Sequence, residues 1–124
     1  MEKFLWISIG AVAGANLRYW VGGWAVDRFG GSFPYGTLLI NISGSLILGV
    51  ILGMVSSHYV IDPRLRLLLT IGFLGSYTTF STFTYESVAM LQQGQWLLGL
   101  FNLIGSSILG GLAAILGLWI GKLV

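Results

Sequence analysis

The sequence is poor in the residue types on which most enzyme chemistry depends. Among 124 residues there is no cysteine and only one histidine, and the few carboxylates are not clustered. The missing thiols exclude disulfides, thiolate zinc sites and thiol redox chemistry. There is no phosphate-binding glycine motif either, so neither an activated nucleophile nor a metal-bound water can be assembled. The sequence therefore predicts a protein that is not an enzyme.

Charge is also scarce, which excludes an ordinary soluble domain. Only 8% of the residues are charged and 56% are hydrophobic, whereas a soluble domain usually has about 25% charged residues. A transmembrane helix needs roughly 20 apolar residues. We therefore expect an all-α integral membrane protein, with a single four-helix transmembrane domain over residues 1–124. Six Lys and Arg against four Asp and Glu give no basic surface for nucleic acid.

Turn residues and charges divide the chain into four apolar segments. The dividing stretches are residues 27–34, the Asp62-Pro63 turn and the polar sequence QQGQ at 92–95. The predicted spans are residues 4–26, 35–57, 65–91 and 96–120. Tryptophans lie near the predicted span ends, where indole rings prefer the headgroup region. Although the first residues also fit a signal-peptide pattern, the apolar run continues past the cleavage-like site.

Small residues recur at four-residue intervals in three of the segments. The pairs and rows are Gly10 with Gly14, Ser45 with Gly49 and Gly53, Ser107 with Gly111, and Gly117 with Gly121. In lipid, such rows allow helix backbones to approach closely. We expect them to mark helix contacts.

The basic residues are divided unevenly, but only slightly, between the two ends of such a bundle. They are Lys3, Arg64, Arg66 and Lys122 at one end and Arg18 and Arg28 at the other. The positive-inside rule therefore favours cytoplasmic termini by a small margin. A chain with so weak a bias can insert in both orientations, which permits an inverted homodimer.

The third segment carries an unusual number of hydroxyl groups. Its stretch GFLGSYTTFSTFTYE, from Gly72 to Glu86, has eight hydroxyl side chains in fifteen positions. A continuous helix over 65–91 would be about 40 Å long, more than the roughly 30 Å hydrocarbon core requires. Gly72 and Gly75 weaken the helix, and threonine hydroxyls can satisfy freed backbone groups. We therefore expect a helix break near Thr78, at the bilayer midplane.

A break at this depth is suited to binding ions. Non-helical backbone is tolerated in a membrane only where protein buries it or where it lines a wet cavity. Free carbonyls can bind a cation, and the N-terminus of the second half-helix favours an anion. The alternative is a hydroxyl-rich helix whose side chains bond to their own backbone or to neighbouring helices. Composition alone does not decide between the two.

Five other side chains are candidates for a functional site. Phe80 and Phe83 share a helical face, and an aromatic edge can face a small anion, although buried phenylalanines mostly serve packing. The Asn41 amide can donate to an anion or to a neighbouring helix. Arg18 and Glu86 are charges within apolar segments. Arg18 can extend to the membrane surface, whereas Glu86 can tune a pore, take a proton or accept from a hydroxyl.

Four motifs together resemble those of the CrcB/Fluc family of fluoride channels. They are GANLRY at 14–19, YGTLLIN at 35–41, GFLGSYTTFSTFTYE at 72–86 and QQGQ at 92–95. The resemblance extends over essentially the whole chain. It implies an antiparallel homodimer in the inner membrane of a prokaryote, with two fluoride pathways and a structural Na⁺ ion at the dimer centre.

The resemblance also implies roles for individual residues. It places the ring edges of Phe80 and Phe83 along the ion path, and the backbone carbonyls of Gly75 and Thr78 around the Na⁺ ion. The other matched pathway residues are Thr37, Asn41, Ser81, Thr82, Glu86, Asn102 and Ser106. The fourth span departs from the family pattern, because Gly110 stands where a hydroxyl is common. The continuity of a polar track along that span is therefore in question.

Two other functions are compatible with a short four-span protein. A small multidrug transporter depends on a carboxylate in its first span, and this chain has none between Lys3 and Val26. The second is a scaffold subunit without transport of its own, for which Phe80→Ala and Asn41→Ala would change assembly but would change no ion flux. A fluoride pore instead predicts hydrogen bonds and ring edges that replace water, with no fixed cation to trap the ion.

Overall fold

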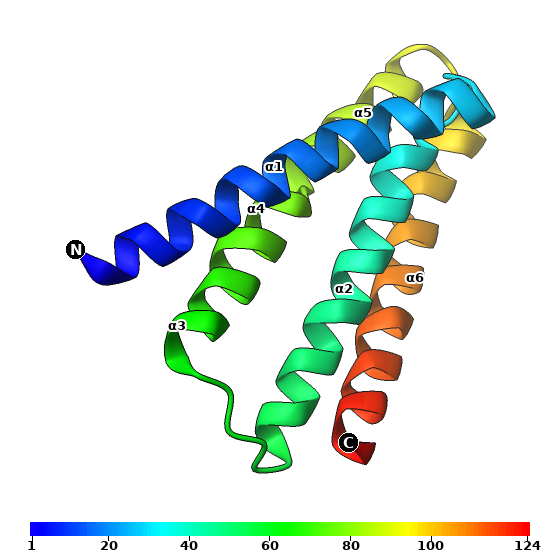
Figure 1. The fold of residues 1–124 in the computed structure, drawn as a ribbon. Coiled ribbons are helices and arrows are strands. Elements are labelled where there is room, and N and C mark those ends of the chain that lie inside the picture. Colours follow the sequence, from blue (N-terminus) through cyan, green and yellow to red (C-terminus); the bar gives the residue numbers. More distant parts are fainter.

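A computed structural model describes all 124 residues, and every regular element in it is a helix. The elements are α1 (Glu2–Phe29), α2 (Tyr35–Ser56), α3 (Pro63–Arg66), η1 (Leu67–Leu74), α4 (Gly75–Tyr77), α5 (Phe80–Gln92) and α6 (Trp96–Leu123) (Figure 1). The third predicted segment thus consists of α3, η1, α4 and α5. The prediction of an all-α protein with four helical segments, the third of them broken, is confirmed.

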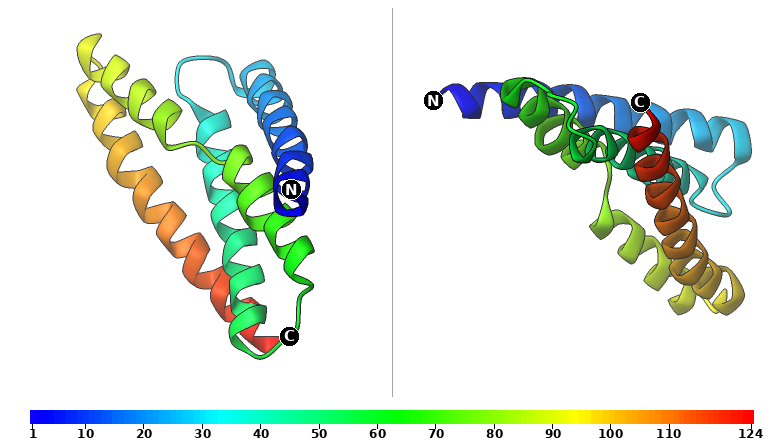
Figure 2. Two further views of the ribbon diagram at one scale, coloured as in Figure 1. Left: turned by 90° about the vertical axis from the view of Figure 1, so that its left-hand side faces the viewer. Right: turned by 90° about the horizontal axis from the view of Figure 1, so that it is seen from below.

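Helices α2 and α6 pack side by side along most of their length (Figures 1 and 2). Gly49 and Gly53 of α2 face Gly117 and Gly121 of α6, and a Cβ atom on any of the four would collide with the facing backbone. This close backbone approach is the usual packing of helices in lipid. Both helices are long and apolar enough to cross a membrane.

Helix α1 packs against the first half of the third segment. A Cβ atom on Gly10 would collide with the backbone of η1, and one on Gly72 would collide with the backbone of α1. The Ser76 hydroxyl lies 3.0 Å from the Ala11 carbonyl oxygen and 2.6 Å from that of Gly72. The small residues at these positions therefore serve helix contacts, as the sequence indicated.

The third segment departs from regular α-helix before it breaks. It begins regularly, because the Asp62 carboxylate accepts a hydrogen bond from the Arg64 amide at 2.8 Å and Pro63 occupies the first turn. Residues Leu67–Leu74 form a π-helix, a rare geometry that is frequent at functional sites. Thr78 and Thr79 are then extended, with ψ angles of 157° and 120°. The predicted break near Thr78 is confirmed.

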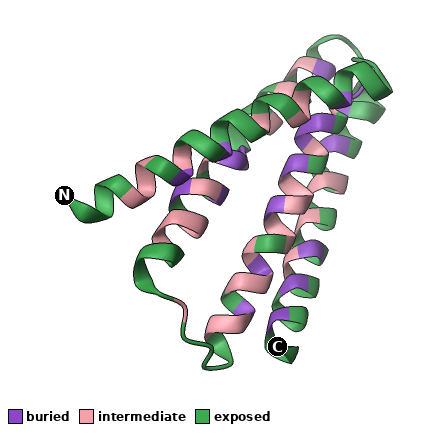
Figure 3. Ribbon diagram, in the orientation of Figure 1, coloured by how far each residue is buried: buried purple, intermediate pink, exposed green.

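After the break, α5 turns away from α1 and packs along α6 (Figure 2). The buried residues lie mainly on the facing sides of the helices, and the outer surfaces are exposed (Figure 3). Many of the exposed side chains are large and apolar, including Phe80, Leu97 and Ile115. Such a surface requires lipid or another chain to cover it.

Candidate functional site

The extended break is held in place by Asn41 of α2. Its Nδ2 atom donates to the Thr79 carbonyl oxygen at 2.9 Å, and its Oδ1 atom accepts from the Thr79 amide at 2.8 Å. The interhelical role that the sequence allowed for Asn41 is therefore present. A side-chain amide has two N–H donors, and only one of them is used within the chain. The second N–H of Asn41 remains able to donate to an ion.

The break leaves several backbone carbonyls without hydrogen-bond partners, and those of Gly75 and Thr78 are among them. The regular helical partner of the Gly75 carbonyl would be the Thr79 amide, but that amide donates to Asn41. The regular partner of the Thr78 carbonyl would be the Thr82 amide, which instead donates to the Thr79 hydroxyl at 3.3 Å. Neither carbonyl oxygen accepts another hydrogen bond. They are the two carbonyls that the family resemblance assigned to Na⁺, and the chemistry of free carbonyl oxygens fits a cation.

Helix α5 begins immediately after the break, so its positive end lies there. Thr79 is the N-cap residue, and its hydroxyl donates to the Thr82 hydroxyl at 3.0 Å. Because Thr82 accepts in this pair, its own O–H is free to donate. The Ser81 hydroxyl has no hydrogen-bond partner in the chain and is exposed. Two hydroxyl donors therefore lie in the first turn of α5, where the helix dipole favours an anion.

Phe80 and Phe83 line a cavity at the break. Their ring centroids are 6.1 Å apart and the rings are inclined at 51°. The cavity has a volume of about 280 Å³ and is bounded also by Asn41, Gly75 and Thr78. Phe80 is 79% exposed, so its ring is available to a second copy of the chain or to an ion. The structure thus gathers both phenylalanines, the amide and the two free carbonyls around one cavity.

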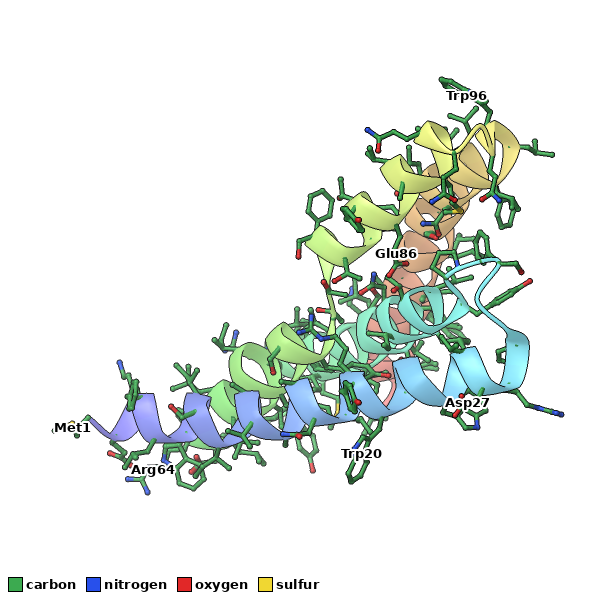
Figure 4. All side chains as sticks on the ribbon, turned by 90° about the horizontal axis from the view of Figure 1, so that it is seen from above. Met1, Trp20, Asp27, Arg64, Glu86 and Trp96 are labelled. Atoms are coloured by element: carbon green, nitrogen blue, oxygen red, sulfur yellow. The ribbon has the colours of Figure 1, made fainter.

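A second, larger cavity lies between α1, α2 and α5. Its volume is about 650 Å³, and its walls include Arg18, Thr37, Thr82 and Glu86. The Thr37 hydroxyl donates to Glu86 Oε1 at 2.8 Å, whereas Glu86 Oε2 is buried without a partner. Figure 4 shows Glu86 on the side of α5 that faces α2. Thr79 lies on the walls of both cavities, so the two cavities adjoin at the break.

The fourth-segment candidates lie apart from both cavities. Asn102 Nδ2 donates to the Ser87 hydroxyl at 2.8 Å, and the Ser106 hydroxyl donates to Asn102 Oδ1 at 2.9 Å. Asn102 is 1% exposed and Ser87 is fully buried. In the single chain these groups join α5 to α6, and the pathway role of Asn102 and Ser106 stays a prediction.

Ser45 and Thr70 are further polar residues that border the first cavity, and the sequence pattern indicated only a packing role for Ser45. Ser45 lines the cavity with Asn41, from which it is one helical turn removed. A Cβ atom on Gly110 would lie 3.8 Å from the Ser45 hydroxyl oxygen. The four-residue spacing from Asn41 places both side chains on one helix face, and this spacing is the signal that could have identified Ser45.

Comparison with known proteins identifies the family. A family model described as "CrcB-like protein, Camphor Resistance (CrcB)" matches residues 5–118. The chain belongs to the CrcB family. It is 44% identical to the fluoride-specific ion channel FluC of Chloroflexus aurantiacus, over 98% of this chain and 97% of that protein. The FluC protein of Koribacter versatilis is 46% identical over 94% of this chain and 92% of its own.

A third relative extends over the whole chain. The fluoride-specific ion channel FluC of Maridesulfovibrio salexigens is 40% identical over 100% of this chain and 98% of that protein. The CrcB family is a family of bacterial membrane ion channels. The predictions of an integral membrane location and of a protein without enzymatic activity are therefore confirmed.

Proposed function

We propose that the chain forms a fluoride-selective channel that passively exports F⁻ from the cytoplasm and thereby relieves fluoride toxicity. The relatives described above are named as fluoride-specific channels. The observation that carries the proposal is the cavity at the break. It combines a free amide N–H on Asn41 with the two phenylalanine rings, next to the positive end of α5.

The selectivity follows from the groups around this cavity. Fluoride is small and strongly hydrated, so a pore must replace its water by short hydrogen bonds. Asn41 supplies a donor within the cavity, and the edges of Phe80 and Phe83 supply weakly positive C–H groups. The Thr82 hydroxyl lines the adjoining second cavity, and the Ser81 hydroxyl is exposed in the first turn of α5. No Lys or Arg lines the cavity. A fixed cation would hold the anion, whereas conduction requires that a binding site release its ion.

The channel is proposed to be an antiparallel homodimer with two pores. Phe80 is largely exposed in the single chain, and the cavity at the break is open on the side that no element of the chain covers. A second, inverted copy would bring an identical break to the same depth, because the break lies near the middle of its segment. Each break would then supply rings to a pore and cover apolar surface of its partner.

The same proposed arrangement would provide a site for a structural Na⁺ ion. The carbonyl oxygens of Gly75 and Thr78 from both copies would hold it at the dimer centre. Oxygen ligands suit a hard cation. When bound, the ion would supply positive charge that offsets the repulsion between facing carbonyl dipoles.

Export needs no energy source other than the membrane potential. Hydrogen fluoride is a weak acid that crosses membranes uncharged and dissociates in the neutral cytoplasm. An inside-negative potential favours outward movement of each anion by about 2.3 kcal/mol per 100 mV. A passive, fluoride-selective pore would therefore lower the cytoplasmic concentration of the ion.

Reconstitution of the purified chain in liposomes tests the proposal. A fluoride electrode should record rapid fluoride release when K⁺ leaves through valinomycin, and chloride-loaded vesicles should release no chloride. A scaffold subunit would release neither ion, and a multidrug transporter would instead move protons when a cationic drug is added. Either of these two results would overturn the proposal.

A further inference from the structure

A separate basic cavity lies at the end of the molecule where α1 and α3 begin. Its volume is about 430 Å³, within the range of roughly 300–1,000 Å³ typical of small-ligand sites. Lys3 and Arg66 line it together with the apolar side chains of Ile61, Leu67 and Ile71. The cavity therefore places two cations beside an apolar wall.

The acidic side chains nearby do not neutralise these two cations. Glu2 pairs with Arg64, at 2.5 Å between Oε1 and Nε, and this is the only salt bridge in the structure. The Asp62 carboxylate caps α3 by accepting from the Arg64 amide at 2.8 Å. Figure 4 shows Arg64 near the amino-terminal end of α1. Lys3 and Arg66, the two cations that line the cavity, are thus without an acidic partner.

The position of the cavity corresponds to a membrane surface. Arg66 follows the Asp62-Pro63 turn that begins the third segment, and Lys3 lies in the first turn of α1. Ile71, one turn further along the third segment, is 57% exposed. The apolar wall is therefore continuous with side chains that face the hydrocarbon region, as the binding of a molecule with a charged head and an apolar tail requires.

We propose that this cavity binds an anionic phospholipid. Lys3 and Arg66 contact the headgroup phosphate, and an acyl chain lies along Leu67 and Ile71. Basic pockets at the ends of membrane helices bind anionic headgroups in this way. A soluble phosphate would use the cations but not the apolar wall, which is why the lipid is the better match. The proposal depends on the membrane location of the chain and not on fluoride transport.

Native mass spectrometry of the full-length protein in detergent tests this site. Dioleoyl phosphatidylglycerol should bind more tightly than dioleoyl phosphatidylcholine. Lys3→Gln combined with Arg66→Gln should weaken phosphatidylglycerol binding on the order of thirtyfold at low salt, and each single change about fivefold. Lys3→Arg combined with Arg66→Lys should retain binding. The control Lys122→Gln removes a cation at the end of α6, outside the cavity, and should leave binding unchanged.

Three results would overturn the lipid site. They are equal affinity for the two lipids, an equal loss of affinity in Lys122→Gln, and displacement of the lipid by inorganic phosphate at similar concentrations. If the double variant does not elute as a folded protein, the two single variants and the charge-retaining pair give the same decision. Fluoride release does not enter the measurement, so its outcome is independent of the proposed channel activity.

Discussion

The α2–α6 pair and the third segment both cross the membrane, but they differ in the regularity of their backbone. Helices α2 and α6 are uninterrupted, and glycines bring their backbones into direct contact. The third segment begins with one short α-helical turn, continues as a π-helix and ends its first half in an extended break. The backbone groups of α2 and α6 form hydrogen bonds within their own helices, whereas the backbone at the break is hydrogen-bonded by a side chain of α2.

This difference separates the scaffold from the site. In a regular helix the backbone N–H and C=O groups bond to each other, so none of them is free to bind an ion. At the break, the carbonyls of Gly75 and Thr78 lack the hydrogen bonds that a continuous helix would give them. The N–H groups in the first turn of α5 have no helical partners, as at any helix start. Asn41 restores two of the missing hydrogen bonds and leaves the other groups available. The groups proposed to bind ions are therefore those that the regular helices lack.

The largest effect is expected when the close contact between α2 and α6 is disrupted. Gly117→Leu places a side chain against the backbone of α2, where a Cβ atom already collides. Overpacking of this kind typically costs about 1–3 kcal/mol or more, so we expect loss of the folded protein in detergent size-exclusion chromatography. Gly111→Leu is the matched control on the same helix, because nothing lies within 4 Å of its Cβ position. Equal behaviour of the two variants would contradict the packing described here.

The second-largest effect is expected when the hydrogen bonds between α2 and the break are removed. Asn41→Ala removes both hydrogen bonds to Thr79 and the free N–H donor. Because unsatisfied buried groups cost about 1–3 kcal/mol each, we expect fluoride release from liposomes to fall by about tenfold or more. Asn16→Ala removes an exposed amide that bonds only within α1 and should release fluoride at the normal rate. Unchanged release by Asn41→Ala would count against the site.

A smaller effect removes one aromatic wall of the site. Phe80→Ala deletes a ring that lines the cavity at the break but is mostly exposed in the single chain. We expect slower fluoride release by a protein that still elutes as a dimer, since the variant loses one ring edge of the cavity and the Phe80–Phe83 ring pair, which contributes about 0.5–1.5 kcal/mol. Tyr85→Ala, an exposed residue of the same helix outside that cavity, is the control. Loss of assembly without any change in ion flux would instead favour a scaffold subunit that has no transport of its own.

The smallest effect concerns the second cavity. Thr37→Val removes the hydroxyl that donates to Glu86 and leaves both carboxylate oxygens without a partner in the chain. We expect destabilisation of about 1 kcal/mol, measured as a lower thermal midpoint in detergent. Thr37→Ser retains the hydroxyl and should restore the midpoint. A Thr37→Val protein as stable as the original would show that the hydrogen bond contributes little.

The sequence was sufficient for the number of helices and for the position of the break. Turn residues such as Asp62 and Pro63 end segments through local geometry, and Gly75 with the following threonines weakens the helix at Thr78 through backbone propensity. Both effects act within a few residues, so they are visible without the fold.

The contacts between helices were less predictable. The hydrogen bond from Asn102 to Ser87 and the exposure of Ser45 to the cavity depend on how each helix is rotated about its axis. That rotation is fixed by packing between segments that are distant in the sequence. The π-helix of Leu67–Leu74 was also not predicted, because Gly72 indicates only a weak helix and the π geometry arises where this segment packs against α1.

The central claim is that two oppositely inserted copies bring their breaks together in the middle of the membrane. Because the chain lacks cysteine, single changes Gln93→Cys and Lys122→Cys can report orientation through a membrane-impermeant maleimide added to intact cells. Opposite insertion predicts that each cysteine is labelled in about half of the molecules. Complete labelling of one position with none at the other would show a single orientation and would contradict the account.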